Sequence, residues 1–186
     1  MCDIDVRGEW TPIRYPKSYL GGDFVSMTLD GNGKKITNLT VNGDTYLGLF
    51  NMYYGTVKDL TIENMTINGT YDLGAIAGSF CGNILNCNVN NLKINGNYYV
   101  GGLVGFSQTV KADNCTLTGL DLVATWGYSG GLVGCAGGDA TAESYTNNTI
   151  TGRITVPEYG HALCGVSYVN YVNTNNNTDG VEVIIQ

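Results

Sequence analysis

The sequence has few groups that carry charge or acid–base chemistry. Charged residues make up 13% of its 186 residues, it contains one histidine and three prolines, and its net charge is −7. Its nine Lys and Arg residues are scattered, which disfavours nucleic-acid binding because phosphate backbones attract clustered basic residues. No apolar run approaches the length of a membrane span. We therefore expect no nucleic-acid partner and no membrane span.

The cysteines lack the spacing of a metal site. No Cys-x-x-Cys pair occurs, and a single histidine is available to help them, so we expect no metal and no cofactor. Cys87 and Cys115 are 28 residues apart and fall in the repeat position that Leu60 occupies earlier. Buried thiols are the expected role for such residues, with a disulfide as the alternative. The six cysteines are Cys2, Cys81, Cys87, Cys115, Cys135 and Cys164.

Strong helix formers are also scarce. The chain contains 27 glycines and 21 asparagines, both poor helix residues. It is 43% apolar, however, which is enough to fill a core. This mixture with Thr and β-branched residues is typical of many short strands joined by tight turns.

A short motif, Gly-Leu-x-Gly, recurs through the chain. Its central aliphatic residues are spaced by 27, 27, 29 and 31 residues, and a period of this size is typical of solenoids. We expect its glycines to provide positive-φ corners and close approach between stacked backbones. The copies are Gly48–Asn51, Ala75–Gly78, Gly102–Gly105, Gly131–Gly134 and the degraded Ala162–Gly165.

Each repeat reads as two alternating strands, with the glycine motif supplying a third. Inward pairs such as Leu60/Ile62 alternate with outward residues such as Thr61. The same inward pattern recurs at Cys87, Val89, Cys115 and Leu117, with Asn88 and Thr116 outward. Hairpins of an antiparallel sandwich would mirror such a pattern rather than translate it. We therefore predict a right-handed parallel β-helix of five to six coils, each of about 27–31 residues.

The chain is expected to be one domain of three parts. Residues 1–35 form a first coil or cap, 36–140 the regular repeats, and 141–186 degenerate coils that end in a strand at Val181–Ile185. Another strand is predicted at Phe24–Leu29, after an irregular segment around Pro16. Asp30-Gly-Asn-Gly33 should form a turn, with Asp30 as a turn-forming residue rather than a calcium ligand.

These residues resemble the GLUG-motif repeats of bacterial surface proteins over residues 3 to about 140. The resemblance implies a module of a secreted or cell-surface multidomain protein of the adhesin type, with flanking domains in the same polypeptide and no catalytic residues. No signal peptide follows Met1, so we expect an excised or mature part of such a protein. The quoted segments are Asp3–Val6, Trp10–Ile13, Phe24, Thr28–Gly33 and Ile36–Val41.

Convergent catalytic groups are not evident. His161 has no obvious partner, no Gly-x-Ser-x-Gly motif occurs, and Lys93, Lys111 and Arg153 fall in different repeat positions. We therefore expect a protein that is not an enzyme. A carbohydrate-active β-helix enzyme, of the polysaccharide lyase or hydrolase type, is the alternative. An ice-binding solenoid is a third, disfavoured by mixed Thr and Asn and by uneven coil lengths.

Aromatic residues gather just before the glycine motif. Stacked coils would align them as a ladder, a surface that suits sugar rings or a protein partner. The alternative is a structural role, in which the rings pack at coil corners and stabilise one another. We expect the ladder to bind a glycan or a host protein. Its members are Tyr71, Tyr98, Tyr99, Trp126, Tyr128 and Tyr159.

Overall fold

The computed structural model describes residues 2–14, 26–137 and 143–186, and all regular structure in these ranges is β. The strands are β1 (Ile4–Glu9), β2 (Met27–Asn42), β3 (Thr45–Leu47), β4 (Phe50–Asn68), β5 (Tyr71–Leu73), β6 (Ala77–Leu85), β7 (Asn88–Gly96), β8 (Tyr98–Gly101), β9 (Val104–Asp113), β10 (Thr116–Ala124), β11 (Tyr128–Gly130), β12 (Val133–Ala136), β13 (Glu143–Thr146), β14 (Thr149–Val156), β15 (Tyr159–His161), β16 (Cys164–Ser167), β17 (Tyr171–Thr174) and β18 (Asn177–Ile185).

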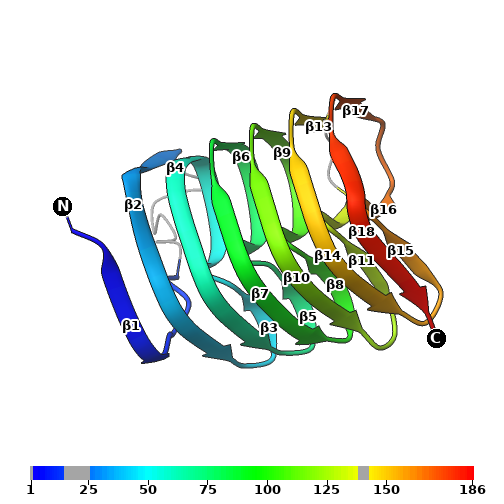
Figure 1. Cartoon of the computed structure of the whole chain (residues 1–186), viewed down its shortest axis with the longest axis horizontal. Helices are drawn as coiled ribbons and strands as arrows, with labels where there is room; N and C mark the ends of the chain where they lie inside the picture. Colours follow the sequence, from blue (N-terminus) through cyan, green and yellow to red (C-terminus); the bar gives the residue numbers. More distant parts are fainter. Residues whose placement is uncertain (1, 15–25, 138–142) are drawn as a thin grey trace, which may run out of the picture.

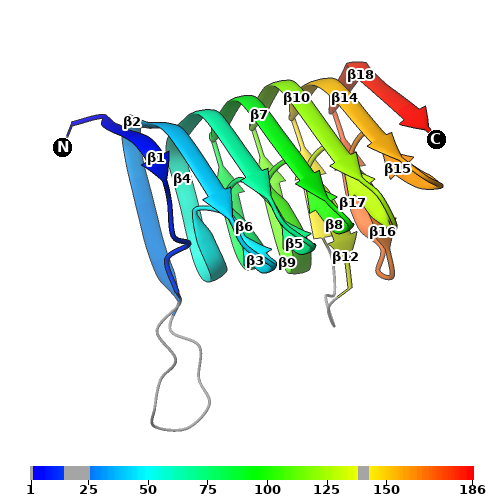
Figure 2. The same ribbon diagram turned by 90° about the horizontal axis from the view of Figure 1, so that it is seen from below.

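The chain winds into coils that stack along one axis, with the termini at opposite ends (Figures 1 and 2). Every pairing between these strands is parallel, for example β4 with β7 and β10 with β14. One sheet has the order β16-β12-β9-β6-β4-β7-β10-β14-β18, and a second, short sheet has the order β15-β11-β8-β5-β3. The predicted β-solenoid is confirmed, with about six coils, and an antiparallel sandwich is excluded.

Stacking in register builds the core from columns of equivalent residues. Ile62 pairs with Ile36 in the preceding coil and with Val89 in the following one. The predicted inward residues Leu60, Ile62, Cys87, Val89, Cys115 and Leu117 are all buried. All six cysteines are free thiols, and burial raises the pKa of Cys87 to about 11 and that of Cys115 to about 12. The predicted packing of Cys87 and Cys115 as buried thiols is confirmed.

Asparagine, rather than the glycine of the repeated motif, supplies most of the left-handed corners. Equivalent residues Asn38, Asn64 and Asn91 have φ of 61°, 55° and 55°. Each also donates a side-chain hydrogen bond to the coil before it, as Asn91 Nδ2 does to Asn64 Oδ1 at 3.1 Å. Asparagine tolerates this conformation better than other residues with a Cβ because its short side chain bonds locally. The prediction that motif glycines would provide these dihedrals is wrong.

The motif glycines serve the predicted close approach instead. Gly102 does not have a positive φ, but a Cβ there would lie 2.1 Å from the carbonyl oxygen of Gly131 in the next coil. The motif also bends between strands, from β8 into β9, rather than forming a third strand of its own. The third strand is the segment before it, Tyr98–Gly101 in this coil.

The first part of the chain keeps the expected turn inside a longer strand. Pro16 and Phe24 lie outside the described residues, and β2 begins at Met27. A register shift follows Asp30, whose Oδ1 accepts a hydrogen bond from the Asn32 N–H at 2.8 Å. The predicted turn-forming role of Asp30 is confirmed. At the other end, Val181–Ile185 lies within β18, as predicted for a final strand.

Adding a methyl group at Gly102 should destabilise the fold far more than adding one at Gly8. The Gly102→Ala Cβ would clash with backbone, and we expect a loss of about 2–4 kcal/mol in the free energy of unfolding. Nothing lies within 4 Å of a Cβ at Gly8, so Gly8→Ala should stay within about 1 kcal/mol of the parent protein. Urea unfolding measures both; equal losses would contradict close approach at the motif.

Two substitutions at Asn91 separate its conformation from its hydrogen bond. Asn91→Gly keeps the left-handed φ and removes the side-chain bond, so we expect a loss of about 0.5–1 kcal/mol. Asn91→Ala adds the cost of holding a Cβ residue at positive φ, about 1–2 kcal/mol more. Thermal and denaturant unfolding should therefore rank the parent first, glycine second and alanine last. A glycine variant less stable than the alanine variant would refute the conformational role.

Candidate binding site

The short sheet carries the aromatic residues that the sequence singled out. Tyr71 lies on β5, Tyr128 on β11 and Tyr159 on β15, while β8 holds both Tyr98 and Tyr99. Trp126 lies in the turn just before β11. The coils thus bring all six residues to one edge of the solenoid, which we call the tyrosine edge.

The rings of the tyrosine edge form two rows. In the first row Tyr71 stacks on Tyr98, with ring centroids 5.2 Å apart and planes 8° apart. In the second row Tyr99 stacks on Tyr128 at 6.1 Å and 11°, and Tyr128 meets Tyr159 at 5.3 Å and 30°. Aromatic pairs at such distances stabilise each other beyond their buried area.

Exposure differs between members, so the two predicted roles divide among them. Tyr99 is half-buried, has a φ of 50° and also packs against Phe106 at 6.3 Å between ring centroids. Its contribution is mainly to the corner. Trp126 is 74% exposed and Tyr159 is 48% exposed, so these rings are open to a ligand.

Two further residues, Tyr46 and Asp72, lie in line with the second row, and spacing in the sequence did not reveal them. Thr45 pairs with Tyr71 and Leu47 pairs with Leu73, which places Tyr46 opposite Asp72, in line with Tyr99. Asp72 Oδ1 is buried, and no hydrogen-bond partner for it occurs among the described residues. Loss of solvent raises the pKa of this carboxyl to about 6.

A groove of about 380 Å³ opens where the two rows meet. Four of its eight lining residues are aromatic, and Glu158 adds a carboxylate to them. Sequence reasoning identified the rings but missed Gly127 and Glu158, which have no aromatic character. The lining residues are Tyr98, Thr125, Trp126, Gly127, Tyr128, Pro157, Glu158 and Tyr159.

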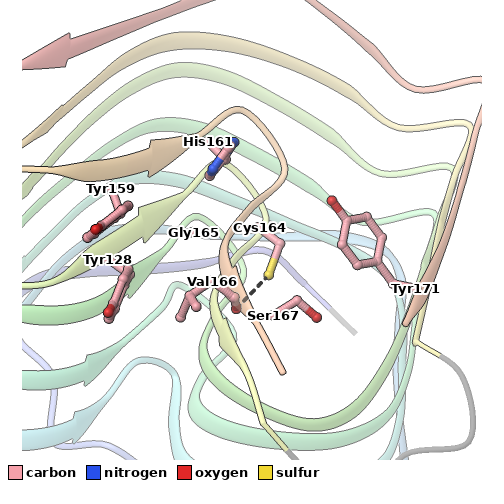
Figure 3. A pocket seen from close by; sticks show the side chains of 8 residues that line it. All are labelled: Tyr128, Tyr159, His161, Cys164, Gly165, Val166, Ser167 and Tyr171. Atoms are coloured by element: carbon pink, nitrogen blue, oxygen red, sulfur yellow. Dashed lines mark hydrogen bonds between the residues drawn. The ribbon is translucent and has the colours of Figure 1, made fainter. Parts of the chain in front are cut away.

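A second pocket, of about 340 Å³, shares Tyr128 and Tyr159 with the groove (Figure 3). Its walls include Tyr128, Tyr159 and Tyr171, and His161 and Cys164 also line it. The Cys164 thiol donates to the Val166 carbonyl at 3.1 Å, and burial raises its pKa to about 12. A thiol with this pKa stays protonated at neutral pH, so the proximity of His161 does not create a thiolate nucleophile.

A buried carboxyl group lies in the core near this pocket, and nothing in the sequence pattern pointed to it. Glu143 on β13 is fully buried and accepts hydrogen bonds from Ser107 Oγ and Tyr145 Oη. Burial raises its pKa. Tyr145 in turn contacts Tyr171, with ring centroids 5.1 Å apart and planes tilted by 45°. Because the side chains of Glu143 and Tyr145 are sealed from solvent, we assign the cluster to the core.

Fold and site together define a parallel β-solenoid with aromatic side chains gathered along one edge. No protein-family model matches the chain, so the GLUG resemblance is not confirmed at the level of a family, and no solved structure matches it. The chain is similar to halomucin of Haloquadratum walsbyi, with 44% identity over 55 residues. That match covers 27% of this chain and 1% of halomucin, so the chain spans a very small part of that protein's length.

Two further findings concern the described residues alone. They contain no helix long and apolar enough to cross a membrane, and none of their His, Cys, Asp and Glu side chains form a group of three or more that could hold a metal ion.

Asp72 should make stability depend on pH. Its pKa is about 6 in the fold, above the ordinary value of 3.8, so the folded protein holds this proton more tightly. The associated stability is fully present below about pH 4 and is lost as pH rises through about 6. Asp72→Asn should remove that dependence and raise the free energy of unfolding at pH 7.5 by about 1–2 kcal/mol. The gain is no larger because the Asp72 carboxyl group is partly exposed and solvent screens it.

Denaturant unfolding at pH 4, 6 and 7.5 measures this effect. Asp44→Asn, which removes an exposed carboxyl beside the same sheet, is the matched control. If the two variants show the same pH profile, burial of Asp72 does not control the dependence.

Proposed function

We propose that this chain is a non-catalytic binding module of a larger secreted or cell-surface protein. It recognises a glycan or a host protein through the tyrosine edge. The observation that carries the proposal is the groove of about 380 Å³, whose walls include Tyr98, Trp126 and Tyr159. Tyr and Trp combine a large apolar ring with a polar hydroxyl or N–H, which is why they are enriched at binding hot spots.

The partial match to halomucin supports the modular context. Similarity limited to 55 residues, 1% of that protein, is what we expect of a repeated structural unit used within long chains. The surface location rests on this match and on the resemblance to repeats of bacterial surface proteins. Flanking domains of the same polypeptide are part of the proposal.

The distribution of ionisable groups supports a non-catalytic role. General acid–base chemistry uses positioned groups whose pKa suits the working pH. The described lining of the groove offers one carboxyl group, Glu158, whereas Glu143 is sealed in the core and the Cys164 thiol has a raised pKa. A polysaccharide lyase would need a base and calcium-binding carboxylates in one cleft.

Glycan and protein arrays with the isolated chain test the proposal. Trp126→Ala and Tyr159→Ala remove exposed rings, so both should fold normally and weaken binding about tenfold or more. Tyr168→Ala is the control, because Tyr168 is 68% exposed but belongs neither to the tyrosine edge nor to the described lining of the groove. Binding that survives the double substitution of Trp126 and Tyr159 would rule out the tyrosine edge as the recognition surface.

A further inference from the structure

Contacts between rings cover the aromatic faces that point along each row of the tyrosine edge. The Tyr98 ring is covered on one side by Tyr71, and the Tyr128 ring lies between Tyr99 and Tyr159. A ligand cannot lie flat along these rows, because their interiors present ring edges and hydroxyl groups. The open faces are at the groove: no described ring stacks on Trp126, and Tyr159 is stacked on one side.

The groove exists because the first row lacks a side chain at Gly127. A Cβ at this position would lie 2.4 Å from Cδ1 of Tyr98, so the Tyr98 ring rests directly on the Gly127 backbone. The third ring that would continue the first row is therefore absent. Trp126, the preceding residue, projects into solvent beside this gap.

Charge at the groove has one sign. Glu158 is the one charged side chain among the described residues that line it, and the whole chain carries a net charge of −7. The Glu158 carboxylate raises the pKa of the neighbouring Tyr159 hydroxyl, and both residues line the groove, so the charge lies at its aromatic wall. An acidic polymer would be repelled from such a surface, whereas a cation would be attracted both by Glu158 and by the negative faces of the rings.

The type of cation follows from the aromatic walls of the groove. A primary ammonium is a compact, strongly hydrated charge, and it would have to give up water in order to pack against the rings. A quaternary ammonium has no N–H donor, and its methyl groups pack on aromatic faces while its charge interacts with them.

From the juxtaposition of Trp126, Tyr159 and Glu158 we infer that the groove receives a quaternary ammonium group. The inference rests on the proposed function, since it names the chemistry of the ligand at the same groove. It narrows the recognised glycan or protein to one that carries such a substituent.

Nuclear magnetic resonance of the tryptophan indole N–H groups, with choline as the probe, tests this inference. The chain has two tryptophans, and Trp10 is an internal reference because its Nε1 donates to the Leu49 carbonyl at 3.0 Å, on a different part of the solenoid. Choline should shift the Trp126 signal saturably and leave Trp10 unmoved. The uncharged isostere 3,3-dimethylbutan-1-ol should bind at least about fivefold more weakly than choline does.

Two carboxyl variants complete the experiment. Glu158→Gln should weaken choline binding about fivefold and leave the affinity for the isostere unchanged. Glu182→Gln, which neutralises an exposed carboxyl on β18 away from the groove, should change neither.

The outcomes separate the inference from the proposed function. Equal binding of choline and its isostere, an unmoved Trp126 signal, or full choline affinity in Glu158→Gln would overturn the quaternary ammonium inference. The proposed function would still stand if array binding remained sensitive to Trp126→Ala. Array binding that ignores that substitution would overturn the proposed function on separate grounds.

Discussion

Parallel stacking in register sets each side chain against its counterpart in the next coil, and the other features of the fold depend on that constraint. At the corners it joins asparagines into rows. Asn38 Nδ2 donates to Asp5 Oδ1, and Asn64 Nδ2 donates to Asn38 Oδ1. Because a carboxylate can only accept, Asp5 fixes the orientation of the first amide, and each amide then fixes the next. Glu9 and Asp59 begin two other rows in the same way.

The same constraint limits what the tyrosine edge can bind. Placing like residues over like residues stacks the rings, and stacking stabilises the coils by covering the faces that a ligand would use. Surface that a ligand could contact therefore arises where the repetition fails. Gly127 interrupts the first row and opens the groove, while Asp72 replaces a ring in the second row, and its buried carboxyl oxygen has no hydrogen-bond partner among the described residues.

Local patterns made the coils predictable from sequence, whereas details that depend on exact register were not. The period of Gly-Leu-x-Gly and the alternation around Ile62 each involve neighbouring residues. An asparagine at a corner, such as Asn86, reads the same in sequence as Asn88 on a strand two residues later, so the corner role was assigned to glycine. The connection from Tyr46 to Leu49 is one residue shorter than the connection from Tyr99 to Leu103, so spacing in the sequence does not reveal that Tyr46 lies in line with Tyr99. Glu143 meets Ser107 across 36 residues, a pairing that no local pattern encodes.

A single extra residue explains why the groove lies where it does. Ala124 pairs with Gly96, and the next strands align Tyr128 with Tyr99. The connection from Ala124 to Tyr128 is therefore one residue longer than the equivalent connection from Gly96 to Tyr99. In the following coil, three steps again lead from Val156 to Tyr159. A corner can absorb an added residue without disturbing the stacked strands on either side of it. Here the Thr125 and Trp126 N–H groups still donate to the Gly96 and Asn97 carbonyls. The added residue lies at the corner that holds Trp126 and Gly127, where the Trp126 side chain points into solvent. A side chain suited to binding can therefore be placed at this corner without a change in the packing of the core.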